Sequence, residues 1–137
     1  MSALLPRRPA EFCWLDLAAS DAALARRFYA QAFGWTFHDR HANGGRFTLC
    51  RAGERDVASL YPLRQAQLEL GVPSHWTPYL GVGSADISAR QVVEAGGRVV
   101  VAPFDVRGTA RIALVEDAVG ALLGLWQALP GARSDAP

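Results

Sequence analysis

The sequence repeats itself at an offset of 63 residues. Apolar positions and a helix-ending glycine coincide in the two copies, in the pairs Leu17 and Leu80, Leu24 and Ile87, Tyr29 and Val92, Ala32 and Ala95, and Gly34 and Gly97. A repeat of this length, with one helical segment in each copy, indicates two similar supersecondary units in tandem. The fold must therefore be one in which two copies of the same unit follow each other along the chain.

The first copy is predicted to form a strand, a helix and three further strands. Strand-forming residues fill 12–17, and Ser20 or Asp21 can then cap a helix by accepting a bond from a free backbone amide. Apolar residues on one face and arginines on the other predict an amphipathic helix that ends at Gly34. Further strands are predicted from residue 35, over 46–51 and over 57–61.

The second copy follows the same order after a connector over 64–74. A strand is predicted over 79–82, then a helix capped by Ser84 or Asp86 that ends at Gly96 and Gly97, then strands over 98–103, 111–115 and 121–127. The sequence therefore predicts an α+β fold of two tandem βαβββ modules. We expect a single domain over 11–128, with module 1 at about 11–62, a connector at 63–76, module 2 at about 77–128, and flexible tails at 1–10 and 129–137.

Composition narrows the classes of function. A chain of 137 residues, half of them apolar, can bury a core without disulfides or metal. The net charge is +1 and the basic residues, all arginine, are scattered, whereas nucleic-acid binding needs them clustered. The sequence lacks an apolar run of about 20 residues and a signal peptide, so we expect a cytoplasmic protein without membrane or nucleic-acid partners. Cys13 and Cys50 are predicted to be small buried thiols.

Several segments resemble the vicinal-oxygen-chelate superfamily, which includes glyoxalases, bleomycin-resistance proteins and extradiol dioxygenases. The resemblance covers about residues 11–128 and departs at Ala118, where the family usually has proline. It implies that the two modules form a cup-shaped, half-open mixed β-barrel with the helices outside, and that the protein is a homodimer. The segments that carry it are Phe28 to Trp35, Pro73 to Tyr79, Glu94 to Val99, Val115 to Gly120 and Leu123 to Gln127.

In metal-using members of that superfamily, four His, Gln or Glu side chains point into the cup. Carried over by the resemblance, those positions fall on Trp14, Ser59 (or Ala58 if the alignment shifts by one), Thr77 and Gly124. None of these residues is an ordinary ligand, because divalent transition metals need imidazole, carboxylate or thiolate donors. We therefore predict no metal and no cofactor.

The period of two along a strand predicts which side chains share the cup with those positions. This lining is aromatic with a few polar groups, which is typical of a site for a flat or apolar small molecule. The same rings could instead fill the cup as a second core. The predicted lining consists of Trp14, Asp16, Ser59, Tyr61, Thr77, Tyr79 and Trp126.

Two groups of titratable residues could carry chemistry. Asp16 is the candidate general base, since a carboxylate in an apolar cup has a raised pKa, although it could equally be a bonded carboxylate without a catalytic role. His38, Asp39 and His41 are predicted to lie in a solvated hairpin loop instead of forming a metal site.

Three functional hypotheses follow. The first is a glyoxalase- or bleomycin-resistance-like protein that binds a small aromatic or apolar molecule without metal. The second is a lyase, isomerase or dioxygenase of the same superfamily, with an unrecognised metal or with Asp16 as general base. The third is a dimeric interaction domain without a ligand.

Overall fold

A computed structural model describes residues 10–42, 45–106 and 108–130. The predicted βαβββ order is present twice, and one short helix is added between the copies. The elements are β1 (Phe12–Ala19), α1 (Ala22–Phe33), β2 (Thr36–Ala42), β3 (Gly45–Ala52), β4 (Arg55–Pro62), α2 (Gln65–Glu69), β5 (His75–Gly81), α3 (Ala85–Glu94), β6 (Arg98–Val106), β7 (Ala110–Glu116) and β8 (Leu122–Ala128).

The strands form a mixed eight-stranded sheet in the order β2-β3-β4-β1-β5-β8-β7-β6. In each copy the first strand pairs in parallel with the last one, β1 with β4 and β5 with β8, and the remaining pairs within each copy are antiparallel. The α+β fold of two βαβββ modules, predicted from the repeat, is thereby confirmed.

The chain divides into two compact units. The N-terminal unit comprises residues 15–77, and the C-terminal unit comprises the described parts of 3–14 and 78–137. Strands β1 and β5 each have residues in both units.

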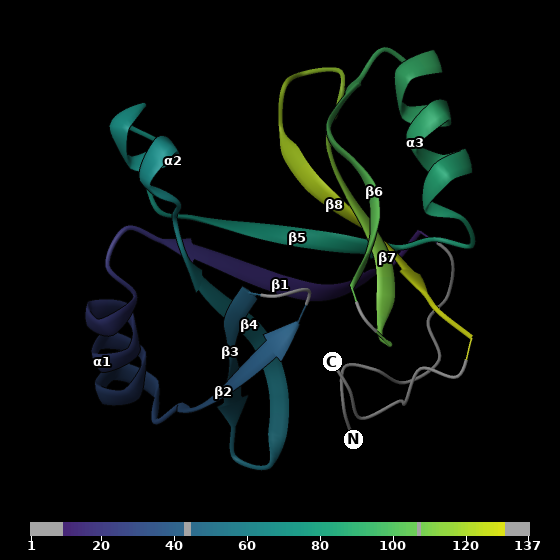
Figure 1. Ribbon diagram of the computed structural model, residues 1–137. Helices are drawn as coiled ribbons and strands as arrows, with labels where there is room; N and C mark the ends of the chain where they lie inside the picture. Colours follow the sequence, from purple (N-terminus) through teal and green to yellow (C-terminus); the bar gives the residue numbers. More distant parts are fainter. Residues whose placement is uncertain (1–9, 43–44, 107, 131–137) are drawn as a thin grey trace. The chain divides into compact units, whose positions relative to one another are not determined.

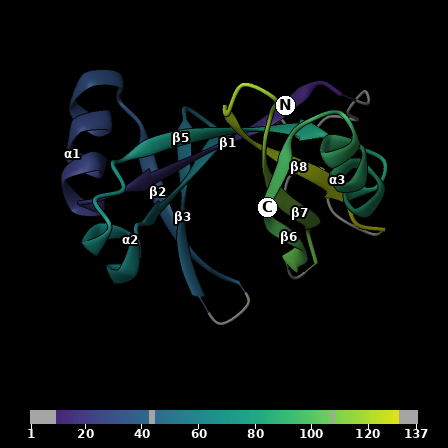
Figure 2. The same cartoon turned by 90° about the horizontal axis from the view of Figure 1, so that it is seen from above.

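In the N-terminal unit, α1 begins and ends where its sequence dictates. The Asp21 carboxylate accepts a bond from the Leu24 amide at 2.9 Å, which satisfies one of the free amides of the first turn. Gly34 ends the helix with a φ of 75°, a conformation that costs glycine little. The helix lies to one side of β2 and β3 (Figure 1, Figure 2). Its Ala25 and Tyr29 pack on a buried cluster of Leu17, Ala19, Cys50, Ala58 and Leu60.

The family-motif aromatics of this unit form a second cluster near the end of α1. The rings of Tyr29 and Trp35 stack with centroids 5.0 Å apart. The indole N–H of Trp76 donates to the Tyr29 hydroxyl at 3.2 Å, and its ring meets Tyr29 edge-on. Packing of Tyr29 against Trp76 therefore ties the start of β5 to α1, whereas Phe28, the other aromatic residue of the pair, is 55% exposed.

In the C-terminal unit, α3 repeats the role of α1. Ser84 caps it by accepting a bond from the Ile87 amide at 3.1 Å. Figure 1 shows the helix beside β6. One face of α3 packs on the sheet through Ala89, which belongs to a buried cluster with Ala113, Val115 and Leu125.

Two predictions about local structure were wrong, and one short helix was not predicted. His38, Asp39 and His41 lie on strand β2, because Asp39 is held there by bonds from the Thr48 hydroxyl at 2.9 Å and from Arg26 at 3.1 Å. The connector contains the helix α2, and β5 begins at His75, earlier than predicted, because Pro78 does not interrupt the strand.

Some predicted features fall outside the described residues, namely the turn at Asn43 and Gly44 and most of the tails at 1–10 and 129–137. Among the residues that the structure describes, the helices are too short or too polar to cross a membrane.

Candidate functional site

The C-terminal unit brings together three of the predicted aromatic residues. The rings of Trp14 and Trp126 have centroids 6.2 Å apart, and Tyr79 meets Trp126 edge-on at 5.9 Å. Their exposed fractions are 3% for Trp14, 2% for Tyr79 and 7% for Trp126. The three rings therefore form a closely packed aromatic group with little surface open to solvent.

Gly124 lies beside this group, and its lack of a side chain leaves room for the Tyr79 ring. It is paired with Tyr79 in the parallel ladder between β5 and β8. A Cβ atom at position 124 would collide with the Tyr79 ring. The ring therefore occupies the space that a metal-binding side chain at this position would need.

The N-terminal unit brings together three polar residues on one face of the β1–β4 pair. Asp16 is the direct partner of Ser59 in the parallel ladder, so both side chains point to the same side of the sheet. Tyr61 lies two residues beyond Ser59 and shares that side. Leu17 and Leu60 alternate with them and face the core on the helix side. Asp16 and Tyr61 are half-buried, whereas Ser59 is buried.

Electrostatics link the members of this polar group. Burial, and to a smaller extent the negative charge of Asp16, raise the pKa of the Tyr61 phenol from its ordinary value of 10 to about 12, while Arg64 opposes the shift. The phenol is protonated at neutral pH, as it would be at its ordinary pKa, and can donate a hydrogen bond. Sequence reasoning did not include Arg64, although its position three residues after Tyr61 is a signal that could have found it.

The last predicted residue, Thr77, is a buried residue of β5 in the N-terminal unit. The predicted lining is thus found as an aromatic group, defined by Trp14, Tyr79 and Trp126, and a polar group, defined by Asp16, Ser59 and Tyr61. The role of these seven residues in binding a ligand stays a prediction.

Comparison with known proteins decides the family. The sequence over residues 12–125 matches the family model of the Glyoxalase/Bleomycin resistance protein/Dioxygenase superfamily. The chain belongs to this superfamily. The resemblance noted in the sequence is therefore confirmed.

Two relatives within the superfamily illustrate its range. The chain is 33% identical over 117 residues to CFP32 of Mycobacterium tuberculosis (strain CDC 1551 / Oshkosh), described by name as a candidate glyoxylase, with 84% of this chain and 44% of the relative covered. It is 32% identical over 140 residues to the anthracycline biosynthesis protein DnrV of Streptomyces peucetius, with 93% and 49% covered. The chain spans about half the length of these relatives.

Two solved structures share the fold. The methylmalonyl-CoA epimerase of Mycobacterium tuberculosis superposes with a TM-score of 0.63 at 18% identity, covering 92% of this chain and 93% of that one. The protein BH1468 of Bacillus halodurans C-125 superposes with a TM-score of 0.67 at 18% identity, covering 92% and 99%. At this identity the likeness shows the fold alone.

Superfamily membership raises the question of a metal ion, and the residues present do not fit one. The indole of Trp14 is packed against Trp126, and Gly124 faces the ring of Tyr79. Ser59 and Thr77 offer only weak hydroxyl donors. Within 10–42, 45–106 and 108–130, no cluster of three or more His, Cys, Asp or Glu residues could hold an ion.

Proposed function

We propose that this chain binds a small aromatic or apolar molecule without a metal ion, and that Asp16 and Tyr61 orient the ligand. The observation that carries the proposal is the half-buried carboxylate and the protonated phenol on the same face of β1 and β4. A few polar groups in an otherwise apolar protein face are the usual means of orienting such a ligand.

The chemistry of the polar group favours a particular ligand class. Tyr61 is protonated at neutral pH, since even its ordinary pKa of 10 lies well above 7, and it can donate a hydrogen bond. Asp16 offers carboxylate oxygens that accept hydrogen bonds. The matching ligand is a flat molecule that carries a carbonyl oxygen beside a hydroxyl group. Two relatives are named for the biosynthesis of anthracyclines, which are flat polycyclic compounds with such oxygens.

Ligand binding to the aromatic group would require a rearrangement of its side chains. Stacking of a ligand on Trp14, Tyr79 or Trp126 requires this group to open, since each ring is less than a tenth exposed. Ser59 and Thr77 are buried as well and would contact a ligand only after a similar rearrangement. The accessible part of the proposed site is therefore the pair of Asp16 and Tyr61.

Binding of quinizarin, a flat dihydroxyanthraquinone, tests the proposal. Saturable binding measured by its visible absorbance should weaken about tenfold in Tyr61→Phe and in Asp16→Ala, because each variant loses the group that would hydrogen-bond the ligand. Tyr29→Phe is the matched control: it removes a phenol of the separate aromatic cluster beside Trp76 and should bind as the wild type does. Equal affinity in all four proteins would refute the assignment.

Elemental analysis tests the metal independence. The purified protein is dialysed against each candidate divalent metal and measured by inductively coupled plasma mass spectrometry. Metal well below one ion per chain is the expected result. One transition-metal ion per chain would contradict the proposal and would favour an enzyme of the superfamily.

A second candidate function is favoured by the electrostatic link between Asp16 and Tyr61, which is the arrangement of a general base beside a proton donor. A lyase or isomerase of this kind would exchange a substrate proton with solvent. The hemithioacetal of methylglyoxal and glutathione, incubated in deuterated water and followed by proton NMR, is a direct test. Exchange that persists in Asp16→Asn would exclude Asp16 as the base.

Two further expectations belong with this proposal. We propose that the protein is a homodimer in the cytoplasm. Light scattering at micromolar concentration checks the oligomeric state, and a monomer there would end the dimer proposal together with the hypothesis of a dimeric interaction domain.

A further inference from the structure

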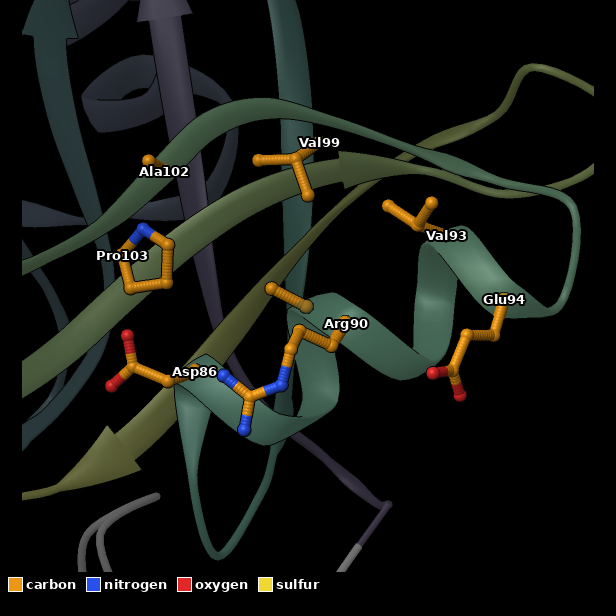
Figure 3. A pocket seen from close by; sticks show the side chains of 8 residues that line it. Asp86, Arg90, Val93, Glu94, Val99, Ala102 and Pro103 are labelled. Carbon is orange, nitrogen blue, oxygen red and sulfur yellow. The ribbon is translucent and has the colours of Figure 1, made fainter.

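A groove lies between α3 and β6 in the C-terminal unit (Figure 3). Its volume of about 460 Å³ falls within the range of small-molecule sites, roughly 300–1,000 Å³. Apolar side chains face each other across it, and charged groups stand on the helix. The lining residues are Asp86, Ala89, Arg90, Val93 and Glu94 from α3, and Val99, Ala102 and Pro103 from β6.

The sequence creates this space in two ways. The pairing of β6 with β7 shifts between Val99 and Val101 and again before Phe104, so the strand departs from a regular path along the groove. The facing side chains of Ala89 and Ala102 are single methyl groups. A larger residue at either position would fill part of the space.

The groove is separate from the aromatic group of the same unit. Val99 pairs with Val115, and both belong to the cluster beneath α3. Gly124 and Trp126 of β8 alternate with Leu125 of that cluster and therefore point to the opposite side of the sheet. A ligand in the groove would not touch Trp126.

The charges around the groove leave no positive surplus. Arg111 donates two hydrogen bonds to the Asp86 carboxylate, at 2.9 Å and 3.1 Å, and a third to Asp105 at 3.0 Å, so one cation is shared by two carboxylates. Arg90 and Glu94 lie one turn apart on α3 and carry opposite charges. An anionic ligand would lose hydration here without a surplus of positive charge in return.

We propose that this groove binds an uncharged, flat, largely apolar molecule of two or three rings. Its faces would contact the methyl groups of Ala89 and Ala102 and the ring of Pro103. This site is additional to the one centred on Asp16 and Tyr61 and does not depend on it.

Two dyes with the same skeleton test the proposal. N-phenyl-1-naphthylamine is uncharged and becomes fluorescent in apolar surroundings, and its sulfonated analogue, 1-anilinonaphthalene-8-sulfonate, adds one negative charge. We expect the uncharged dye to bind saturably and about tenfold more tightly than the sulfonate. Backbone amide NMR shifts should change over residues 86–94 and 98–104. Equal affinity for both dyes, or shift changes confined to other residues, would overturn the proposal.

Variants of β6 and α3 locate the dye. Ala102→Trp places an indole in the groove and should weaken binding of the uncharged dye about tenfold, whereas Ala102→Ser, at the same position, should stay within about twofold of the wild type. Val93→Glu changes a half-exposed position on the helix and should weaken binding even if Ala102→Trp fails to fold. Asp16→Ala should leave dye binding unchanged, which separates this site from the one proposed above. Unaltered binding in both Ala102→Trp and Val93→Glu would also overturn the proposal.

Discussion

Gly124 of β8 lies against the ring of Tyr79 of β5, with no room between them for a side chain. We predict that Gly124→Ala lowers the free energy of unfolding by about 1–3 kcal/mol, because the buried tyrosine ring must leave its place among Trp14 and Trp126. Urea denaturation followed by tryptophan fluorescence measures the change.

A second glycine and a double variant control this prediction. Gly83 has no atom within 4 Å of an added Cβ, so Gly83→Ala should change the stability by less than about 0.5 kcal/mol. Replacing Tyr79 by leucine should reduce the cost of Gly124→Ala, because the collision is removed. Equal costs of Gly124→Ala with and without the tyrosine would show that the ring is not the cause.

The buried thiol of Cys50 makes stability depend on alkaline pH. Burial raises its pKa from the ordinary value of 9 to about 12, with smaller effects of Arg26, which lowers it, and Asp16, which raises it. Below pH 9 the thiol is protonated in both the folded and the unfolded states. Above pH 9 the unfolded thiol ionises first, so we predict that stability falls by about 1.4 kcal/mol per pH unit from this group between pH 9 and 12.

Urea denaturation at a series of pH values checks this prediction. Tyr61 adds its own loss mainly above its ordinary pKa of 10, so the interval between pH 9 and 10 separates the thiols from this phenol. Cys50→Ala is less stable at every pH because of the lost packing, but its stability should change less over that interval. A slope that is unchanged in this variant would show that another group titrates.

Much of the fold could be predicted because it follows from local patterns of residue types. The strand alternation and the two helix caps follow from residue types that act within a few positions, and the repeat then fixes the order of the elements. The N-terminal cap of α1 shows what such patterns cannot decide. Ser20 and Asp21 were equally good candidates, and only the backbone geometry decides for Asp21, while Ser20 bonds with Ser74 instead.

The candidate site was less predictable, since it depends on contacts between distant segments. The period of two correctly placed Asp16, Ser59 and Tyr61 on one side of a sheet. It could not show how tightly Trp14, Tyr79 and Trp126 pack, because their burial depends on how side chains from three strands that are distant in sequence, β1, β5 and β8, fit together. The groove beside α3 was not foreseen. It arises from register shifts in β6 near Pro103, and a proline in a strand indicates a bulge or an edge strand but does not predict the space beside it.

The bond between Arg111 and Asp86 predicts an acid-dependent change in the C-terminal unit. Hydrogen bonding by Arg111 holds the pKa of the Asp86 carboxyl below its ordinary value. The stability that this bond contributes is present above that ordinary value and is lost as the pH falls through the lowered pKa. We predict that Arg111→Gln raises the pKa of Asp86 toward its ordinary value.

Carbon-13 NMR titration of the aspartate carboxyl groups measures this shift directly. Arg98→Gln is the matched control, because Arg98 forms a similar two-bond pair with Glu116 and does not contact Asp86. It should leave the Asp86 titration unchanged. An Asp86 pKa that stays low in Arg111→Gln would assign its shift to the neighbouring Arg90 instead.

The cap of α1 gives a final prediction about stability. The Asp21 carboxylate accepts a bond from the Leu24 amide at 2.9 Å, so Asp21→Ala leaves that amide without its capping partner. We expect a loss of about 0.5–2 kcal/mol in the free energy of unfolding, measured by urea denaturation. Asp21→Asn keeps an oxygen acceptor at the same place and should stay close to the wild type. If the asparagine variant lost as much as the alanine variant, the negative charge near the helix start would be the cause, and the loss should then shrink in high salt.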